Sequence, residues 1–161
     1  MNHLWSPWRM NYISGQEKSN ECVFCEAARR EDGPDNLIIA REKHSFVILN
    51  RFPYTNGHLM VVPFLHTSSI EDLDAATRSE LFEVVNKSVL ALRAEYRPEA
   101  FNIGINLGAA AGAGVSDHIH IHVVPRWSGD TNFMSTIGET RVLPEELAET
   151  YRRMVDRWKA L

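Results

Sequence analysis

Three histidines in a short alternating run are the residues of this chain best suited to chemistry. His118, His120 and His122 are separated by single isoleucines. Successive side chains of a strand point to opposite faces, so an extended run would place all three imidazoles on one face. Each imidazole carries two polar nitrogens that need partners, which makes such a row costly as mere packing. The pattern favours a site that binds a metal, transfers protons or attacks a phosphate.

Cys22 and Cys25 form a second group with chemical potential. Two cysteines separated by two residues supply half of a tetrahedral zinc site. Two other interpretations stay open, a redox dithiol or two small apolar side chains in the core. The chain has 2 cysteines in all, so the sequence predicts no disulfide framework.

A run of glycine and alanine, residues 108–114, comes directly before the histidines. Small residues allow backbone N–H groups to approach an anion closely. No Gly-Lys-Ser/Thr follows, so this is not a Walker loop. A plain connection is the alternative, but the position beside the histidines favours phosphate contact.

Alternating apolar segments predict the strands that must carry these residues. Asn56-Gly57 between two apolar runs indicates a hairpin turn. The order of the first three segments, 37–41, 45–50 and 58–62, implies an antiparallel meander. We expect strands over residues 37–41, 45–50, 58–62, 101–106 and 118–124.

Two segments have the apolar period of a helix, roughly 75–96 and 144–158. In the first, Thr77 and Glu80 have the spacing of a capping box. Strands in one block with helices around them indicate an α+β fold with a five-stranded antiparallel sheet. The predicted apolar stripes are Leu81, Val84, Val85, Val89 and Leu92 in the first helix, and Leu147, Tyr151, Met154, Val155 and Trp158 in the second.

The 161 residues fit a single domain, 1–161, with a core over about 22–130. Residues 1–21 are expected to wrap over this core, and 131–161 to form a tail and helix. A formal charge of -4 predicts no general attraction to nucleic acid or anionic membrane. The start of the chain lacks the layout of a signal peptide, and no apolar run approaches spanning length. A cytoplasmic protein is the expectation.

The run from His118 to Val124 resembles the signature of the histidine-triad (HIT) family of nucleotide-binding enzymes, His-φ-His-φ-His-φ-φ with φ apolar, at every position. Asn50-Arg51, Asn56-Gly57-His58 and Val61-Val62-Pro63 also fall in family order. The resemblance covers roughly Cys22 to Asp130. It implies an α+β subunit that pairs into a homodimer with a continuous sheet.

The resemblance also implies roles for particular residues. His120 would attack the α-phosphate of a nucleotide and form a nucleotidyl-histidine intermediate, with His118 and His122 completing the catalytic triad. His122 would hold phosphate oxygens or the departing group, and His58 would order the triad strand. Asn106, Gly114 and Val115 would contact phosphate, and Asn50 the ribose. A strand-end cap and a turn residue are the alternatives for Asn106 and Asn50.

A structural zinc is the further implication, because some family members complete the cysteine pair with two histidines. Those positions are His66 and His118 here, beside Cys22 and Cys25. Such a metal would connect the N-terminal segment to the triad. The chemistry itself would need no cofactor.

Some segments look closer to the bacterial diadenosine tetraphosphate phosphorylase and fragile-histidine-triad-like branch. These are 4–9, 125–130 and Asn132-Phe133. At the end of the loop, hydrolytic branches of the family carry Gly-Gln and a phosphorylase branch carries Gly-Ser. This chain has Ala113-Gly114 there. The resemblance therefore does not decide whether phosphate or water accepts the nucleotidyl group. The expected ligands are purine nucleotides or dinucleoside polyphosphates, with inorganic phosphate or water as acceptor. A nucleoside phosphoramidate hydrolase and a non-catalytic purine nucleotide-binding module are the alternatives.

Overall fold

The computed structural model describes residues 21–130 and 144–161. The predicted N-terminal wrap, apart from Glu21, and residues 131–143 of the tail lie outside the described residues. The elements in chain order are α2 (Val23–Arg29), β1 (Ile38–Arg41), β2 (Ser45–Leu49), β3 (Leu59–Pro63), α3 (Ala75–Tyr96), β4 (Ala100–Ile105), the 3-10 turn η1 (Ala109–Ala111), β5 (Ile121–Arg126) and α5 (Leu147–Lys159).

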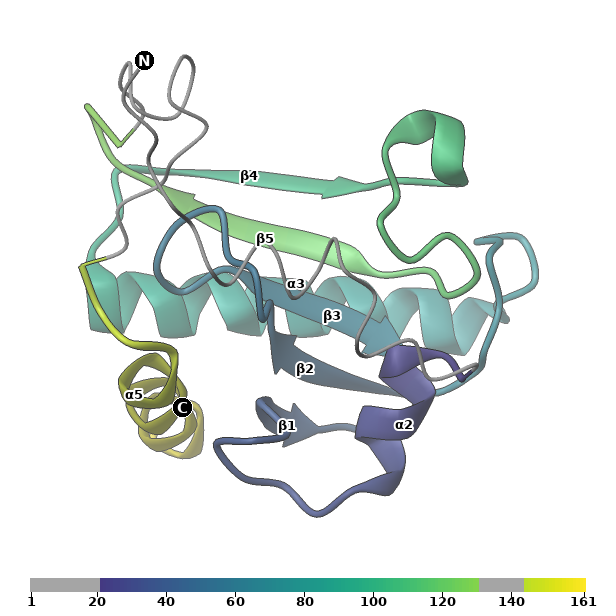
Figure 1. The fold of residues 1–161 in the computed structure, drawn as a ribbon, viewed down its shortest axis with the longest axis horizontal. Helices are drawn as coiled ribbons and strands as arrows, with labels where there is room; N and C mark the ends of the chain where they lie inside the picture. Colours follow the sequence, from purple (N-terminus) through teal and green to yellow (C-terminus); the bar gives the residue numbers. More distant parts are fainter. Residues whose placement is uncertain (1–20, 131–143) are drawn as a thin grey trace, which may run out of the picture.

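The five strands form one sheet in the order β1-β2-β3-β5-β4, and every neighbouring pair is antiparallel. All residues of β2 and β3 are buried, as suits the middle of a sheet covered on both faces. β4 lies at one edge, and most of its residues are exposed (Figure 1). The predicted α+β fold with a five-stranded antiparallel sheet is confirmed.

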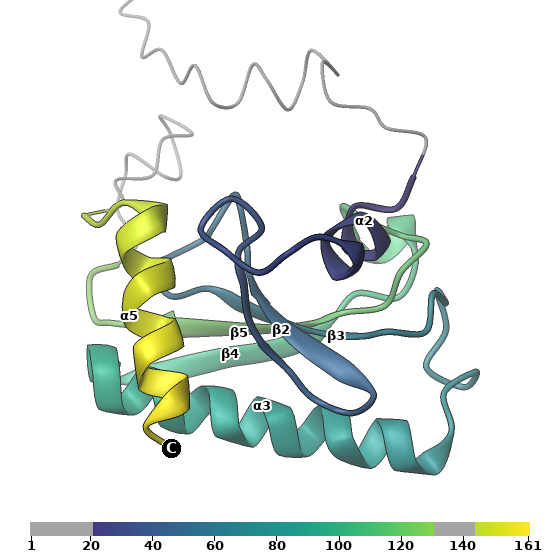
Figure 2. The ribbon, with the colours of Figure 1, turned by 90° about the horizontal axis from the view of Figure 1, so that it is seen from below.

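Helices cover the sheet from two sides. α3 packs on β2, β3 and β5, and α5 packs on α3 and β1. Figure 2 shows α3 running along one side of the sheet, with the short α2 on the opposite side. Four of the five apolar residues predicted for the α3 stripe are buried, and the fifth is half-buried. None of the helices in residues 21–130 and 144–161 has the length and apolar character needed to cross a bilayer.

The predicted capping box of α3 is wrong. Asp74 is the N-cap, and its Oδ1 accepts a 2.7 Å hydrogen bond from the Thr77 backbone N–H. Glu80 instead accepts hydrogen bonds from the His44 N–H and the Ser45 hydroxyl, at 2.8 and 2.7 Å. Its carboxylate therefore ties α3 to the start of β2 instead of closing the helix terminus.

The strand expected over 118–124 begins later, at Ile121, so the prediction is wrong for residues 118–120. The ladder between β3 and β5 ends with the pair Val61–Ile121. Pro63 has no N–H to donate, and its carbonyl accepts a hydrogen bond from the His118 ring. The Ile119 N–H donates to the Thr67 carbonyl at 2.7 Å, outside the sheet. The start of α5 also differs, since it lies at Leu147 instead of residue 144.

The turn between β2 and β3 is held from two directions. Thr55 Oγ1 donates to the Pro125 carbonyl at 2.8 Å, and Asn56 Nδ2 donates to the Glu145 carbonyl at 3.2 Å. Gly57 has φ +78°, and a Cβ there would lie 2.8 Å from Leu92 Cδ2. Glycine is needed here both for its backbone conformation and for the close approach of α3.

Gly57→Ala should lower the free energy of unfolding by about 3 kcal/mol, because the left-handed conformation costs about 1–2 kcal/mol and the overlap with Leu92 adds about 1–3 kcal/mol. Gly112→Ala is the control, because Gly112 has a left-handed backbone with φ +90° and no atom lies within 4 Å of the added Cβ. Urea denaturation of both variants measures the difference. Equal destabilisation would show that the contact with α3 contributes nothing.

Candidate active site

His120 is held in one protonation form by a backbone carbonyl. Its Nδ1 lies 2.9 Å from the His118 oxygen, and because a carbonyl can only accept, Nδ1 carries the proton. The lone pair of the neutral ring is then on Nε2. Burial lowers the pKa of His120, partly offset by this hydrogen bond, so the ring is neutral near pH 7. A neutral imidazole with a free lone pair is a nucleophile.

The lone-pair nitrogen of His120 stays in contact with solvent although the side chain is 4% exposed. Among the described residues, Asn56 Oδ1 is the sole buried side-chain nitrogen or oxygen without a hydrogen-bond partner. His120 Nε2 has no partner among these residues either, so it cannot be fully enclosed. The ring is therefore buried at its base and open at the atom that would react.

His122 has the opposite proton placement, set by a chain of two hydrogen bonds. The Tyr54 backbone N–H donates to His58 Nδ1 at 3.2 Å, which leaves the His58 proton on Nε2. That nitrogen lies 2.9 Å from His122 Nδ1 and donates to it. His122 therefore carries its own proton on Nε2, as a hydrogen-bond donor. Its ring centroid lies 4.7 Å from that of His120.

Burial, together with the charge of the adjacent His120, lowers the pKa of His122 to about 4. Two charged imidazoles at this distance would repel each other, and neither has a carboxylate among its described hydrogen-bond partners. In the free protein the pair is neutral near pH 7. His122 then acts as a neutral donor.

Cys22, Cys25, His66 and His118 converge on one point, as expected for metal ligands. Their ligand atoms all lie within 4.8 Å of one another. Sulfur-to-Nδ1 distances are 3.2 Å for Cys22–His118, 3.3 Å for Cys25–His66 and 3.6 Å for Cys25–His118. Ligands about 2.3 and 2.0 Å from a tetrahedral ion would lie about 3.5 Å apart, so this donor set fits such an ion.

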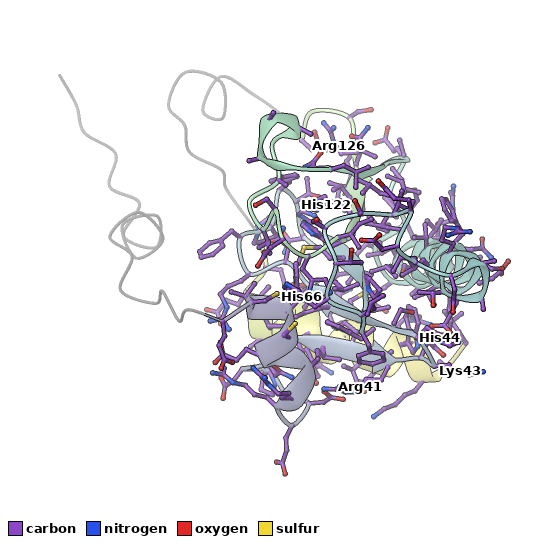
Figure 3. The ribbon with its side chains drawn as sticks, turned by 90° about the vertical axis from the view of Figure 1, so that its right-hand side faces the viewer. Arg41, Lys43, His44, His66, His122 and Arg126 are labelled. Carbon is purple, nitrogen blue, oxygen red and sulfur yellow. The ribbon has the colours of Figure 1, made fainter. Side chains whose placement is uncertain are left out.

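The orientation of His118 also suits a metal ligand. Its Nε2 donates to the Pro63 carbonyl at 2.9 Å, so the lone pair lies on Nδ1, the nitrogen that faces the sulfur atoms. In Figure 3 the labelled His66, His122 and Arg126 lie one above another, with His66 lowest and Arg126 highest. The three histidines of the run thus differ in what they can offer: His118 a lone pair toward the sulfur atoms, His120 a lone pair on Nε2, and His122 an N–H on Nε2.

The helix that carries the cysteines was not predicted. α2 has only seven residues, and Cys22 at its N-cap makes no side-chain capping bond. Glu26 in its first turn and Arg29 in its last suit the helix dipole, and this charge order is the signal that the sequence offered. Phe24 is the buried residue of α2, and its ring contacts both His118 and His120. Sequence reasoning missed Phe24 and the Tyr54 N–H.

The expected phosphate and ribose contacts lie at the ends of strands. Ile105 at the end of β4 pairs with Ile121 at the start of β5. Asn106 directly follows Ile105, and His120 directly precedes Ile121, so both lie at the same end of this strand pair. Asn50 Oδ1 accepts from the Phe52 N–H at 2.9 Å, which is the turn role considered as its alternative. In the glycine and alanine loop, Gly114 is exposed and Val115 packs half-buried against the core.

Two surface hollows lie away from the histidines. One of about 420 Å³ is lined by residues of α3 and α5, among them Glu95, Arg153 and Arg157. The other, of about 250 Å³, is lined by six residues that include Arg30 and Arg51. The triad instead lies at strand ends beside a loop, so a ligand there would be held by groups around the ends of β4 and β5.

Residues 31–129 match the family model described as the HIT domain. The match spans more than half of the chain, and the protein therefore belongs to the HIT family. The predicted resemblance to this family is confirmed.

The AP-4-A phosphorylase of Mycobacterium tuberculosis is 38% identical over 98% of this chain and 85% of its own length. A zinc-bound histidine triad family protein from Mycobacterium smegmatis has a similar structure, with a TM-score of 0.69, 30% identity and coverage of 88% of this chain and 95% of that one. A hypothetical histidine triad nucleotide-binding protein from Sulfolobus tokodaii shares the fold, with a TM-score of 0.70, 24% identity and coverage of 87% and 93%. Family membership and the named enzyme support a nucleotide-processing enzyme.

The lowered pKa of His122 should make the protein less stable in acid. Its pKa is about 4 when folded and about 6.5 when unfolded, so the unfolded chain binds the extra proton between these values. Stability from this group is present above pH 6.5 and is lost as the pH falls toward 4. His122→Asn keeps an acceptor for His58 and removes the titration. Melting temperatures between pH 7.5 and 5 should fall less steeply in the variant, and parallel curves would contradict the assignment.

Proposed function

We propose that the protein is a nucleotidyltransferase that cleaves the phosphoanhydride of adenosine-containing dinucleotides such as diadenosine tetraphosphate. The observation that carries the proposal is the hydrogen bond from His120 Nδ1 to the His118 carbonyl, which leaves a solvent-contacting lone pair on Nε2. The similarity to an AP-4-A phosphorylase over nearly the whole chain supports this substrate class.

The reaction is a double displacement. His120 Nε2 attacks the α-phosphorus, a P–N bond forms, and the P–O bond to the remaining phosphates breaks with its electron pair on the leaving oxygen. An acceptor oxygen then attacks the same phosphorus and restores the free imidazole. With diadenosine tetraphosphate the first step releases ATP. The second gives ADP when the acceptor is phosphate and AMP when it is water.

The neighbouring groups would position phosphate and stabilise its charge. His122 carries its proton on Nε2, and its ring lies beside that of His120. This N–H would donate a hydrogen bond to a phosphate oxygen or to the leaving oxygen. The Asn106 amide and the backbone of the loop at Gly114 and Val115 would hold other oxygens, while His118 fixes the nucleophile through its carbonyl. Asn50 would contact the ribose by giving up its bond to Phe52.

Phosphate is the acceptor that we favour, because the relative similar over nearly the whole chain is named a phosphorylase. In this chain Ala113-Gly114 brings no polar side chain to the end of the loop. Selection of phosphate over water would therefore depend on backbone N–H groups and on the imidazoles. Both acceptors are compatible with the attack by His120.

Incubation with diadenosine tetraphosphate, with and without inorganic phosphate, tests the function. ADP plus ATP should appear only with phosphate, as measured by chromatography of the products. AMP plus ATP regardless of phosphate would mean hydrolysis. In the control variant His120→Gly, turnover should fall at least about a thousandfold while nucleotide affinity stays within about threefold. Residual turnover comparable to wild type would refute covalent catalysis by His120.

We propose that the metal cluster, formed by Cys22, Cys25, His66 and His118, holds a zinc ion. Two thiolates and two neutral imidazoles suit zinc, and a similar structure from Mycobacterium smegmatis is zinc-bound. With four protein ligands it would supply structural stabilisation, since no position would stay open for a reactant. The ligands would link α2 to the residues around the triad, because His118 is both a ligand and the anchor of His120.

Cys25→Ser should lower the zinc content from about one ion per chain to below about 0.2, because one of four ligands is lost. Elemental analysis after dialysis measures this. The melting temperature should fall as well, and an added chelator should no longer change it. Val23→Ala, on the same helix turn with a side chain 50% exposed, is the control and should keep the metal. Equal metal content in Cys25→Ser and wild type would overturn the assignment.

We also propose that the protein forms a homodimer. β4 is an edge strand that pairs only with β5 among the described residues, and Ile103 on it is 48% exposed. Phe82 and Leu90 on α3 are also exposed, at 60% and 50%. Pairing of two β4 edges would cover unpaired backbone groups and continue the sheet into a second copy. Cytoplasmic localisation and the division of the chain into wrap, core and tail stay predictions.

A further inference from the structure

Phe24 is a buried aromatic residue in contact with two histidines of the triad. Its side chain is 4% exposed, and it is the buried residue of α2. Its ring centroid lies 5.5 Å from that of His118, edge-on at 80°, and 4.9 Å from that of His120, tilted by 52°. Val23, its neighbour on the helix, is 50% exposed. The side chain is thus part of the hydrophobic core and contacts the imidazoles from within it.

The contact completes the restraint of the His120 ring. The hydrogen bond to the His118 carbonyl fixes which nitrogen carries the proton, but one bond leaves the ring able to tilt about it. The His122 ring lies 4.7 Å away at 74°, and Phe24 supplies a second ring contact. Two aromatic neighbours limit tilting of the imidazole and so the direction of its lone pair.

A metal bound by Cys22, Cys25, His66 and His118 would help to set the position of Phe24. Cys22 lies two residues before it and Cys25 one residue after it, so candidate ligands flank it on the first turn of α2. Hydrogen bonds also hold the far end of the helix, from Asn36 to the Ala27 carbonyl and from Arg41 to the Ala28 carbonyl. Ligands on both sides of Phe24 would fix its ring relative to His118.

We propose that Phe24 is a positioning residue for His120, held in place by the Cys22–Cys25 pair and bracing the imidazole in its attacking orientation. The proposal rests on the proposed function of His120. It gives α2 a role in catalysis although no atom of Phe24 takes part in bond making. Misplacement of a reacting group lowers the rate of the chemical step more than it lowers substrate affinity, so we expect the effect of Phe24 in kcat.

Phe24→Ala and Phe24→Leu test the proposal, with Val23→Ala as the matched control. Turnover of diadenosine tetraphosphate gives kcat and KM, and elemental analysis with circular dichroism reports metal content and folding. Nitrogen-15 NMR of the substrate-free protein at pH 7.5 reports the position of the His120 proton. In wild type we expect the proton on Nδ1 alone.

In Phe24→Ala we expect a loss of about tenfold in kcat with KM within about threefold, together with a mixed or broadened His120 signal. Phe24→Leu should recover part of kcat, and Val23→Ala should match wild type. An unchanged kcat with the His120 signal of wild type would overturn the proposal. So would a raised KM with unchanged kcat, which would make Phe24 a nucleotide contact. The NMR measurement needs no substrate, so an inactive wild type would refute the proposed function and leave Phe24 still testable.

Discussion

The site depends on the hydrogen bonds that fix the proton of each imidazole. A neutral histidine has two tautomers of similar energy, and only one of them suits a given role. Here a backbone group decides each case, because the Pro63 and His118 carbonyls accept from His118 and His120, and the Tyr54 N–H directs His58 and through it His122. Each of the three histidines of the triad thereby has a defined proton position, which suits the role that we propose for it. Burial then keeps the rings neutral, since it lowers the pKa of all three.

His118 joins the two halves of this arrangement. Its side chain faces the cysteine pair, while its carbonyl accepts a hydrogen bond from His120, the proposed nucleophile. The early end of the ladder between β3 and β5 makes this possible. Had β5 begun at His118, backbone pairing would have used the Pro63 carbonyl that now orients the ring. A shorter strand is therefore part of how the site is built.

Much of the architecture was predictable because it is local. The apolar period predicted the bounds of α3 as 75–96, and the predicted bounds of β1, β2, β3 and β4 agree with the structure within one residue at each end. The four candidate metal ligands were named through a family resemblance, and they do converge. What could not be predicted depends on contacts distant in sequence. Phe24 and His118 are far apart in the chain, and the role of the Pro63 carbonyl follows only once β3 and β5 are adjacent.

The hydrogen bond from Asn56 to Glu145 connects the turn before His58 to the last helix, α5. Asn56 donates to the carbonyl of Glu145, whose carboxylate accepts hydrogen bonds from Tyr96 and Thr150 and forms an ion pair with Arg153. The residues around α5 therefore help to hold the turn whose Tyr54 N–H donates to His58. Through Glu145 and Asn56, the C-terminal helix thus supports the turn that fixes the proton of His58 and, through His58, that of His122.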